Sequence, residues 1–244
     1  MALGWIWPYR KNTELRNTDR WFNNLALTFG NGLLIRLFVP LGLIHIIELE
    51  SLQPFKLLNF SGANPWLHFA FGVVLLDLSI YWQHRLTHMI PLLWRLHRVH
   101  HSDVEFDTTT AGRFHTLEIF FSFVLKAIIA VVFDLSAASI IAFEILLNFS
   151  SLFNHTNIHF PDPMEKILRW IVITPDLHRI HHSTYHDEMN RNFGFSISLW
   201  DRLFKSLKNQ GRHPQDTMKI GLKKFRSRKD QSLWALLKQP LLKD

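Results

Sequence analysis

Four long apolar blocks constrain what this chain can fold into. They run roughly over residues 25–48, 66–83, 117–133 and 137–153. Each is near the ~20 residues that an α-helix needs to cross the hydrocarbon core of a bilayer. Of the 244 residues, 48% are hydrophobic, and many of them gather in these blocks instead of alternating with polar residues at amphipathic spacing. We therefore expect an all-α integral membrane bundle of about four transmembrane helices, and not four buried helices of a soluble protein.

Each apolar block contains one interior charge, and these charges need partners. The residues are Arg36, Asp77, Lys126 and Glu144. A charge in the middle of a membrane costs at least ~2.5 kcal/mol unless its side chain reaches the interface or pairs. Asp77 lies two helical turns before His84. We expect it to pair with a group near that histidine or with Lys126.

The positive charges predict how the helices are oriented. Lys and Arg number four before residue 25, one in 49–65, four in 84–116, none in 134–136 and sixteen after 153. Because cytoplasmic loops carry the excess of positive charge, the three rich segments are expected on the cytoplasmic side. Four crossings with both termini in the cytoplasm follow. The membrane would be a bacterial inner membrane or the endoplasmic reticulum.

The composition removes several classes of protein. The chain has no Cys, which excludes disulfides, thiolate zinc sites, iron–sulfur clusters and a Cys nucleophile. The basic tail from residue 213 fits a solvated or headgroup-facing segment better than a nucleic-acid site, so no nucleic-acid partner is expected. The first residues are too polar after residue 7 for a signal peptide. We expect a single membrane domain over residues 1–244.

Ten of the fifteen histidines fall into four short boxes with HxxxH or HxxHH spacing. Residues three and four apart share one face of a helix, so each box places two or three imidazoles on one side of a turn. Neutral imidazole binds iron, zinc, copper and nickel. Ten nitrogens exceed the needs of one metal ion and suit two ions with about five ligands each. The boxes are HRLTH (His84, His88), HRVHH (His97, His100, His101), HTNIH (His155, His159) and HRIHH (His178, His181, His182).

The positions of the boxes predict where this di-metal site lies. The first box continues directly from the second apolar block, and the third box continues from the fourth block. The two helices would therefore deliver their boxes to the same, cytoplasmic, face of the membrane. The HxxHH boxes would fold over them as a cytosolic helical cap. A lipid chain could rise from the bilayer to meet a site placed there.

The boxes and their order resemble the fatty acid hydroxylase/sterol desaturase superfamily, and in particular its bacterial sterol desaturase family members. The resemblance covers residues 66–207. Two positions depart from the family pattern: Thr116 stands where a proline is usual, and Lys205-Ser206 stand where Gly-Thr is usual. The similar segments are WRLHRVHHSDVEFDTTTAGRFH (94–115), FNHTNIHFP (153–161), TPDLHRIHHS (174–183) and NFGFSISLWDRLF (192–204).

The resemblance implies a helical bundle with a cytosolic cap, metal ligation by histidine alone, and oxidation of a lipid that depends on O2 and on external electrons. It assigns the ligand roles to the ten boxed histidines. The cofactors would be two iron ions, with zinc as an alternative occupant of the purified protein. The substrate would be a sterol or fatty-acyl lipid, hydroxylated or desaturated at a C–H bond. No haem, flavin or nucleotide motif is visible, so a separate cytochrome b5-like or ferredoxin-type electron donor with its reductase is implied.

Residues beside the boxes are expected to support the ligands. Metal-bound imidazoles usually donate their second N–H to a carboxylate or carbonyl. No acid, base or nucleophile beyond the metal ligands is required for this chemistry. The residues expected to line the site, to bind a metal in one state or to orient its ligands are His115, Glu118, Asp103, Asp107, Asn154, Asp176, His186 and Asn192.

Three other functions are alternatives to this one. An acyl-chain desaturase proper also uses histidine boxes, and product analysis would separate it from a hydroxylase. A metal transporter would place its ligands near the bilayer midplane, whereas these boxes lie outside the apolar blocks. A zinc-loaded membrane hydrolase would need a base such as that of HExxH, which the sequence lacks.

Overall fold

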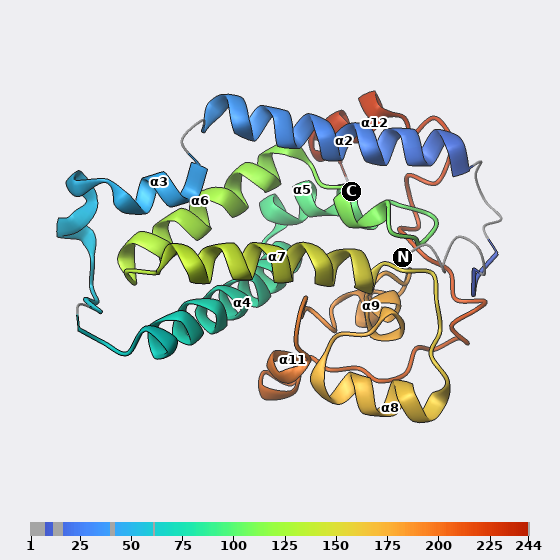
Figure 1. Cartoon of the computed structure of the whole chain (residues 1–244). Helices are drawn as coiled ribbons and strands as arrows, with labels where there is room; N and C mark the ends of the chain where they lie inside the picture. The colour runs from blue at the N-terminus through green and yellow to red at the C-terminus, as the bar shows by residue number, and fades with distance from the viewer. Residues whose placement is uncertain (1–7, 12–16, 40–41, 61, 244) are drawn as a thin grey trace.

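The computed structural model describes residues 8–11, 17–39, 42–60 and 62–243. Within these ranges the chain is helical, and its only β-pairings are the isolated bridges Val172–Ile197 and Ser183–Ile220. The predicted all-α fold is therefore confirmed (Figure 1). The elements are α2 (Asn17–Phe38), α3 (Gly42–Glu48), η1 (Glu50–Phe55), α4 (Pro65–Met89), α5 (Pro91–His101), η2 (Thr110–Gly112), α6 (Thr116–Val132), α7 (Ala137–Asn154), α8 (Asp162–Ile171), α9 (Pro175–His181), α10 (His186–Met189), α11 (Leu199–Leu203), α12 (Leu233–Lys238) and η3 (Gln239–Leu241).

The long helices form a bundle, and the short helices α8, α9 and α11 gather near one end of it (Figure 1). α4 packs against α7, and α3 packs against α6. The buried apolar side chains between α4, α6 and α7 include Leu76, Ile80, Ala130, Ile140 and Phe143. This core holds the ends of α4 and α7 in place beside the short helices.

Three segments of the described chain are long and apolar enough to cross a membrane, by length and composition: Thr18–Glu48, Pro65–Met89 and Ala137–Asn154. The remaining predicted block forms α6, which has 17 residues. At 1.5 Å per residue α6 is about 26 Å long, slightly less than the ~30 Å of the hydrocarbon core. The predicted membrane bundle is confirmed, and the predicted count of four crossings is approximate.

The first long helix starts earlier than its apolar block. α2 begins at Asn17 in the described chain, about eight residues before the predicted start. Its first turns bind the segment that follows α5. Arg20 is buried and pairs with Asp103 and Asp107, with 2.9 Å from its Nη1 to Asp103 Oδ2. Asn24 Nδ2 donates to the same Asp103 oxygen at 3.0 Å. A buried arginine needs such partners, since leaving one unpaired would be strongly destabilising.

A proline turns the chain between the first two histidine boxes. α4 ends at Met89, Ile90 is extended with φ −96° and ψ 116°, and Pro91 is the first residue of α5. A residue before proline disfavours helical geometry, and proline itself fits the first turn of a helix. α5 therefore folds back against α4. This turn brings the second box beside the first.

The segment that contains α11 (Leu199–Leu203) is anchored to α4 by a buried indole and a buried tyrosine. Trp200 Nε1 donates to Asp77 Oδ2 at 2.7 Å, and Tyr81 Oη lies 2.7 Å from Ser206 Oγ. The expected pairing of Asp77 with Lys126 is wrong, because Asp77 accepts from Trp200 and Lys126 instead pairs with Glu144. The short helix α11 is thus fixed to the side of α4.

We expect Trp200→Phe to lower the free energy of unfolding by about 1–3 kcal/mol, because the buried Asp77 carboxylate would lose its indole donor. Denaturant unfolding of the purified protein in detergent measures this. The same change at Trp234, which is 73% exposed, is the control. Equal losses in both variants would contradict the anchoring role.

Candidate metal centre

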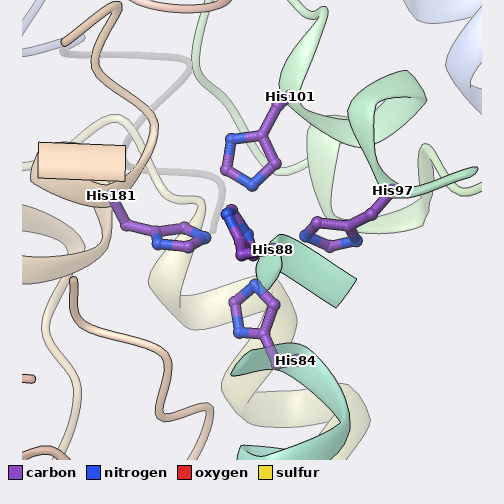
Figure 2. Close-up of side chains that lie close together, drawn as sticks. All are labelled: His84, His88, His97, His101 and His181. Carbon is purple, nitrogen blue, oxygen red and sulfur yellow. The ribbon is translucent and has the colours of Figure 1, made fainter. Parts of the chain in front are cut away.

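Nine of the ten boxed histidines lie in two groups. Within each group, one nitrogen of every ring lies within 4.8 Å of the corresponding nitrogens of the others. We call them the five-histidine group and the four-histidine group. Figure 2 shows the rings of the first converging on one point. The five-histidine group is His84, His88, His97, His101 and His181, and the four-histidine group is His100, His155, His178 and His182.

Each HxxHH box is divided between the two groups. On α5, the first and last histidines of the box join the five-histidine group, and His100 joins the other. On α9 the division is reversed, so that His181 joins the five-histidine group. Residues four apart lie over one another on a helix, whereas adjacent residues point about 100° apart. The HH dipeptide therefore lets one helix contribute a histidine to each of the two groups.

Three of the five rings in the five-histidine group are held by hydrogen bonds on their outer nitrogens. The Nδ1 atoms of His84 and His181 lie 2.7 Å from the backbone oxygens of Phe193 and Arg191. His97 Nδ1 lies 2.6 Å from Glu118 Oε1. The Nε2 atoms of these three rings are buried and have no partner among the described residues. A neutral ring that donates from Nδ1 directs its Nε2 lone pair inward, as metal binding requires.

The four-histidine group is more tightly convergent. His155 Nε2 lies 3.3, 3.2 and 3.1 Å from the Nε2 atoms of His100, His182 and His178. A metal ion about 2.1 Å from each nitrogen would separate neighbouring ligands by about 3.0–3.4 Å. The spacing therefore fits a shared ion. His155 Nδ1 lies 2.7 Å from Ser151 O, which fixes its tautomer for this role.

Burial favours the neutral form of several of these imidazoles. It lowers the pKa of His155 from 6.5 to about 4 and that of His181 to about 3. Neutral imidazole is the form that binds a metal ion. Burial also lowers the pKa values of His100, His101, His178 and His182 well below 6.5.

The structure does not bring His159 into either group. Its Nδ1 lies 2.8 Å from Asp176 Oδ2, and its ring stacks on Tyr9 with 4.7 Å between centroids. The reason is local: α7 ends at Asn154, and His155 is its C-terminal cap. Helical spacing therefore does not continue from His155 to His159.

Only one of the neighbouring carboxylates predicted to orient a ligand contacts a grouped imidazole in the described chain, and that is Glu118. Asp103 and Asp107 instead pair with Arg20. Asp176 pairs with Arg179 at 2.7 Å, besides its contact with His159. Asp103 and Asp107 thus join α2 to the segment after α5, and Asp176 joins α9 to His159.

The other predicted neighbours hydrogen-bond to the backbone or are exposed. Asn154 Nδ2 donates to Phe195 O at 2.7 Å, and Asn192 Nδ2 donates to Leu177 O at 2.8 Å. His115 Nδ1 accepts from the backbone N–H of Leu117 at the start of α6. His186 is exposed and lines a separate cavity of about 360 Å³. Sequence reasoning missed the backbone acceptors Phe193 and Arg191, because a carbonyl carries no sequence signal.

A cavity of about 640 Å³ runs from the five-histidine group into the bundle. His84 and His97 form part of its wall, and the lining also includes aliphatic side chains from α2, α3, α6 and α7. Two buried polar atoms near the histidines, Gln83 Oε1 and Glu118 Oε2, have no hydrogen-bond partner in the described chain. The site is therefore connected to an apolar space of lipid-chain dimensions.

Fold and site together define a class: a helical membrane protein with a histidine-rich site that fits metal ions. The model of the fatty acid hydroxylase family matches residues 69–206. The chain belongs to this family, within the fatty acid hydroxylase/sterol desaturase superfamily. The resemblance seen in the histidine boxes is thus confirmed.

The curated relatives oxidise lipids, as their names state. Alkylglycerol monooxygenase of Homo sapiens is 29% identical over 179 residues, 71% of this chain and 38% of the relative. Ornithine lipid hydroxylase OlsE of Rhizobium tropici is 27% identical over 212 residues, 85% of this chain and 63% of the relative. Lathosterol oxidase of Mus musculus is 27% identical over 192 residues, 74% of this chain and 61% of the relative. The chain thus covers less than two thirds of each relative, and no solved structure matches it.

We expect the purified protein to bind two metal equivalents, and His181→Ala or His178→Ala to weaken binding of one equivalent at least tenfold, because each removes a ligand from a different group. Elemental mass spectrometry after dialysis measures this. His159→Ala and His186→Ala, which lie outside both groups, should retain both equivalents. Loss of metal in the His159 variant would restore the ten-histidine ligand set.

The metal-free protein should lose stability in acid. Imidazoles with a lowered folded-state pKa stabilise the fold above the unfolded value of 6.5, and this stability is lost between there and about 4 for His155 or about 3 for His181. Each such group contributes up to about 1.4 kcal/mol per pH unit in this window. Thermal unfolding of chelator-treated protein between pH 7 and 4.5 measures the slope. His181→Ala should flatten it, whereas His186→Ala should not, and a slope of opposite sign would refute the assignment.

Proposed function

We propose that this protein is a membrane-bound di-iron oxidoreductase that uses O2 and external electrons to hydroxylate a C–H bond of a lipid. One observation carries the proposal: the apolar cavity of about 640 Å³ opens onto His84 and His97, which belong to the five-histidine group. A lipid chain in this cavity would therefore end at the metal site.

The donor set and the relatives together favour iron. Imidazole suits iron, zinc and copper, so the ligands alone do not choose between them. Zinc has no redox chemistry, whereas the relatives are named as a monooxygenase, a hydroxylase and an oxidase. Two iron ions held by the nine grouped histidines would supply the activation of O2 that attack on an unactivated C–H bond requires.

The chain's own residues position and enclose the reaction. Hydrogen bonds from the outer nitrogens of His84, His97 and His181 fix the orientation of the ligands. Phe193 and Phe195 cover the ring of His84 at centroid distances of 5.7 and 5.0 Å. This apolar cover excludes water from the site, which protects a reactive centre from side reactions. The aliphatic cavity walls hold the substrate chain against the five-histidine group.

We also propose on which side of the membrane the site lies and which kind of protein donates its electrons. The site and both termini face the cytoplasm, as the distribution of Lys and Arg predicts. A separate cytochrome b5-like or ferredoxin-type protein with its reductase delivers the electrons. An acidic donor would suit the basic segments, because complementary charge steers association.

Mass spectrometry of lipid products tests the proposal. Iron-reconstituted protein is incubated with membrane lipids, a reducing system and ¹⁸O2. We expect one ¹⁸O atom in a hydroxylated lipid, and no product from zinc-loaded protein or from His100→Ala/His181→Ala. An alkene without ¹⁸O would identify a desaturase instead. Hydrolysed lipid from the zinc-loaded protein would point to a hydrolase.

A further inference from the structure

The cavity contains an ion pair far from the metal site. Lys126 on α6 pairs with Glu144 on α7, and both residues line the same cavity as His84 and His97. Their side chains are 12% and 35% exposed. Ionisable groups inside membrane-crossing helices are costly and usually mark a functional site. This pair is not part of the histidine site.

Helix geometry places the pair at a defined depth. Glu118, which contacts His97, and Lys126 are eight residues apart on α6 and both line the cavity. At 1.5 Å per residue they are about 12 Å apart along the helix. On α7, Glu144 lies eleven residues before His155, or about 16 Å along the helix axis. Both helices therefore put the pair well away from the histidines.

Away from the histidines, Asn31 and Thr28 on the cavity wall are already hydrogen-bonded within the protein. Asn31 Nδ2 donates to Phe114 O at 2.8 Å, and its Oδ1 accepts from Thr116 at 2.7 Å. Thr28 Oγ1 donates to Asn24 O at 2.9 Å. An ammonium group has three N–H donors and a carboxylate has about four acceptor positions. One ion pair leaves donors on Lys126 and acceptor positions on Glu144 for a ligand.

We propose that Lys126 and Glu144 bind the polar end of the substrate, and that this end is a neutral hydroxyl group. A hydroxyl both accepts and donates, so it can accept from Lys126 and donate to Glu144 without changing the net charge of the cavity. The inference rests on the proposed lipid oxidation and narrows its substrate to amphiphiles with an aliphatic chain and a distal hydroxyl. The oxidised carbon would lie on the order of ten carbon–carbon bonds from that hydroxyl, given the ~12 Å along α6.

Binding of a matched pair of probes tests the subsite without any turnover. Tritiated 1-dodecanol is bound to purified protein in detergent, and unlabelled 1-dodecanol and dodecane compete for it. We expect dodecane to compete about tenfold more weakly with the wild type, because it cannot make the hydrogen bonds. For the Lys126→Met/Glu144→Gln variant, the affinities of 1-dodecanol and dodecane should agree within about twofold.

Two further variants separate recognition from folding. Ile141→Ala changes the apolar wall of the same cavity. It should alter the affinities for 1-dodecanol and for dodecane while keeping the ratio between them. The exchanged pair Lys126→Glu/Glu144→Lys keeps both charges and should restore the preference for 1-dodecanol. If the neutral double variant does not fold, Glu144→Gln alone should reduce the preference. An unchanged preference in a folded neutral variant would overturn the subsite and leave only a structural ion pair.

Product analysis then tests the predicted depth and keeps the two proposals distinct. With 1-alkanols of 12 to 16 carbons, the wild type should place the new oxygen at a constant number of bonds from the hydroxyl. A constant distance from the methyl end would overturn the subsite while leaving lipid oxidation intact. Preferential binding of 1-dodecanol by a protein that forms no oxidised product would support the subsite and refute the proposed activity.

Discussion

The structure depends on packing nine imidazoles together in two groups. A charged imidazole costs too much in a buried site, so burial lowers the pKa of rings such as His155 and His181. A neutral ring still needs an acceptor for its N–H group, and the backbone oxygens of Phe193, Arg191 and Ser151 serve three of the nine rings. The loop conformation around the site is therefore dictated by the ligands. A metal ion would satisfy the inward nitrogens that the protein leaves without partners.

The fold brings the boxes together through turns and buried polar anchors. Pro91 begins a new helix after a turn, so that α5 packs against α4. Arg20 ties the start of α2 to the acidic segment after α5, and Trp200 ties α11 to α4. Each anchor joins segments far apart in the sequence and leaves a buried charge if broken. The same anchors explain why acids beside the boxes, such as Asp103, do not reach the imidazoles.

The sequence predicted the parts of the site that lie on continuous helices. His84 and His88, four residues apart on α4, share one group as expected. His159 of the HTNIH box lies outside both groups because α7 ends first, and apolar periodicity does not reveal where a helix ends. The division of each HxxHH box between two groups depends on how α5 and α9 face each other. That is a tertiary property, as is the pairing of Lys126 with Glu144.

The helices that carry the ligands at one end also line the cavity along their length. α4 supplies His84 and α7 leads into His155, while α6 begins beside Glu118 and continues past Lys126. Position along these helices is therefore a measure of distance from the histidines, at 1.5 Å per residue. A protein built in this way can select a substrate by where polar groups stand on the wall, without changing a ligand.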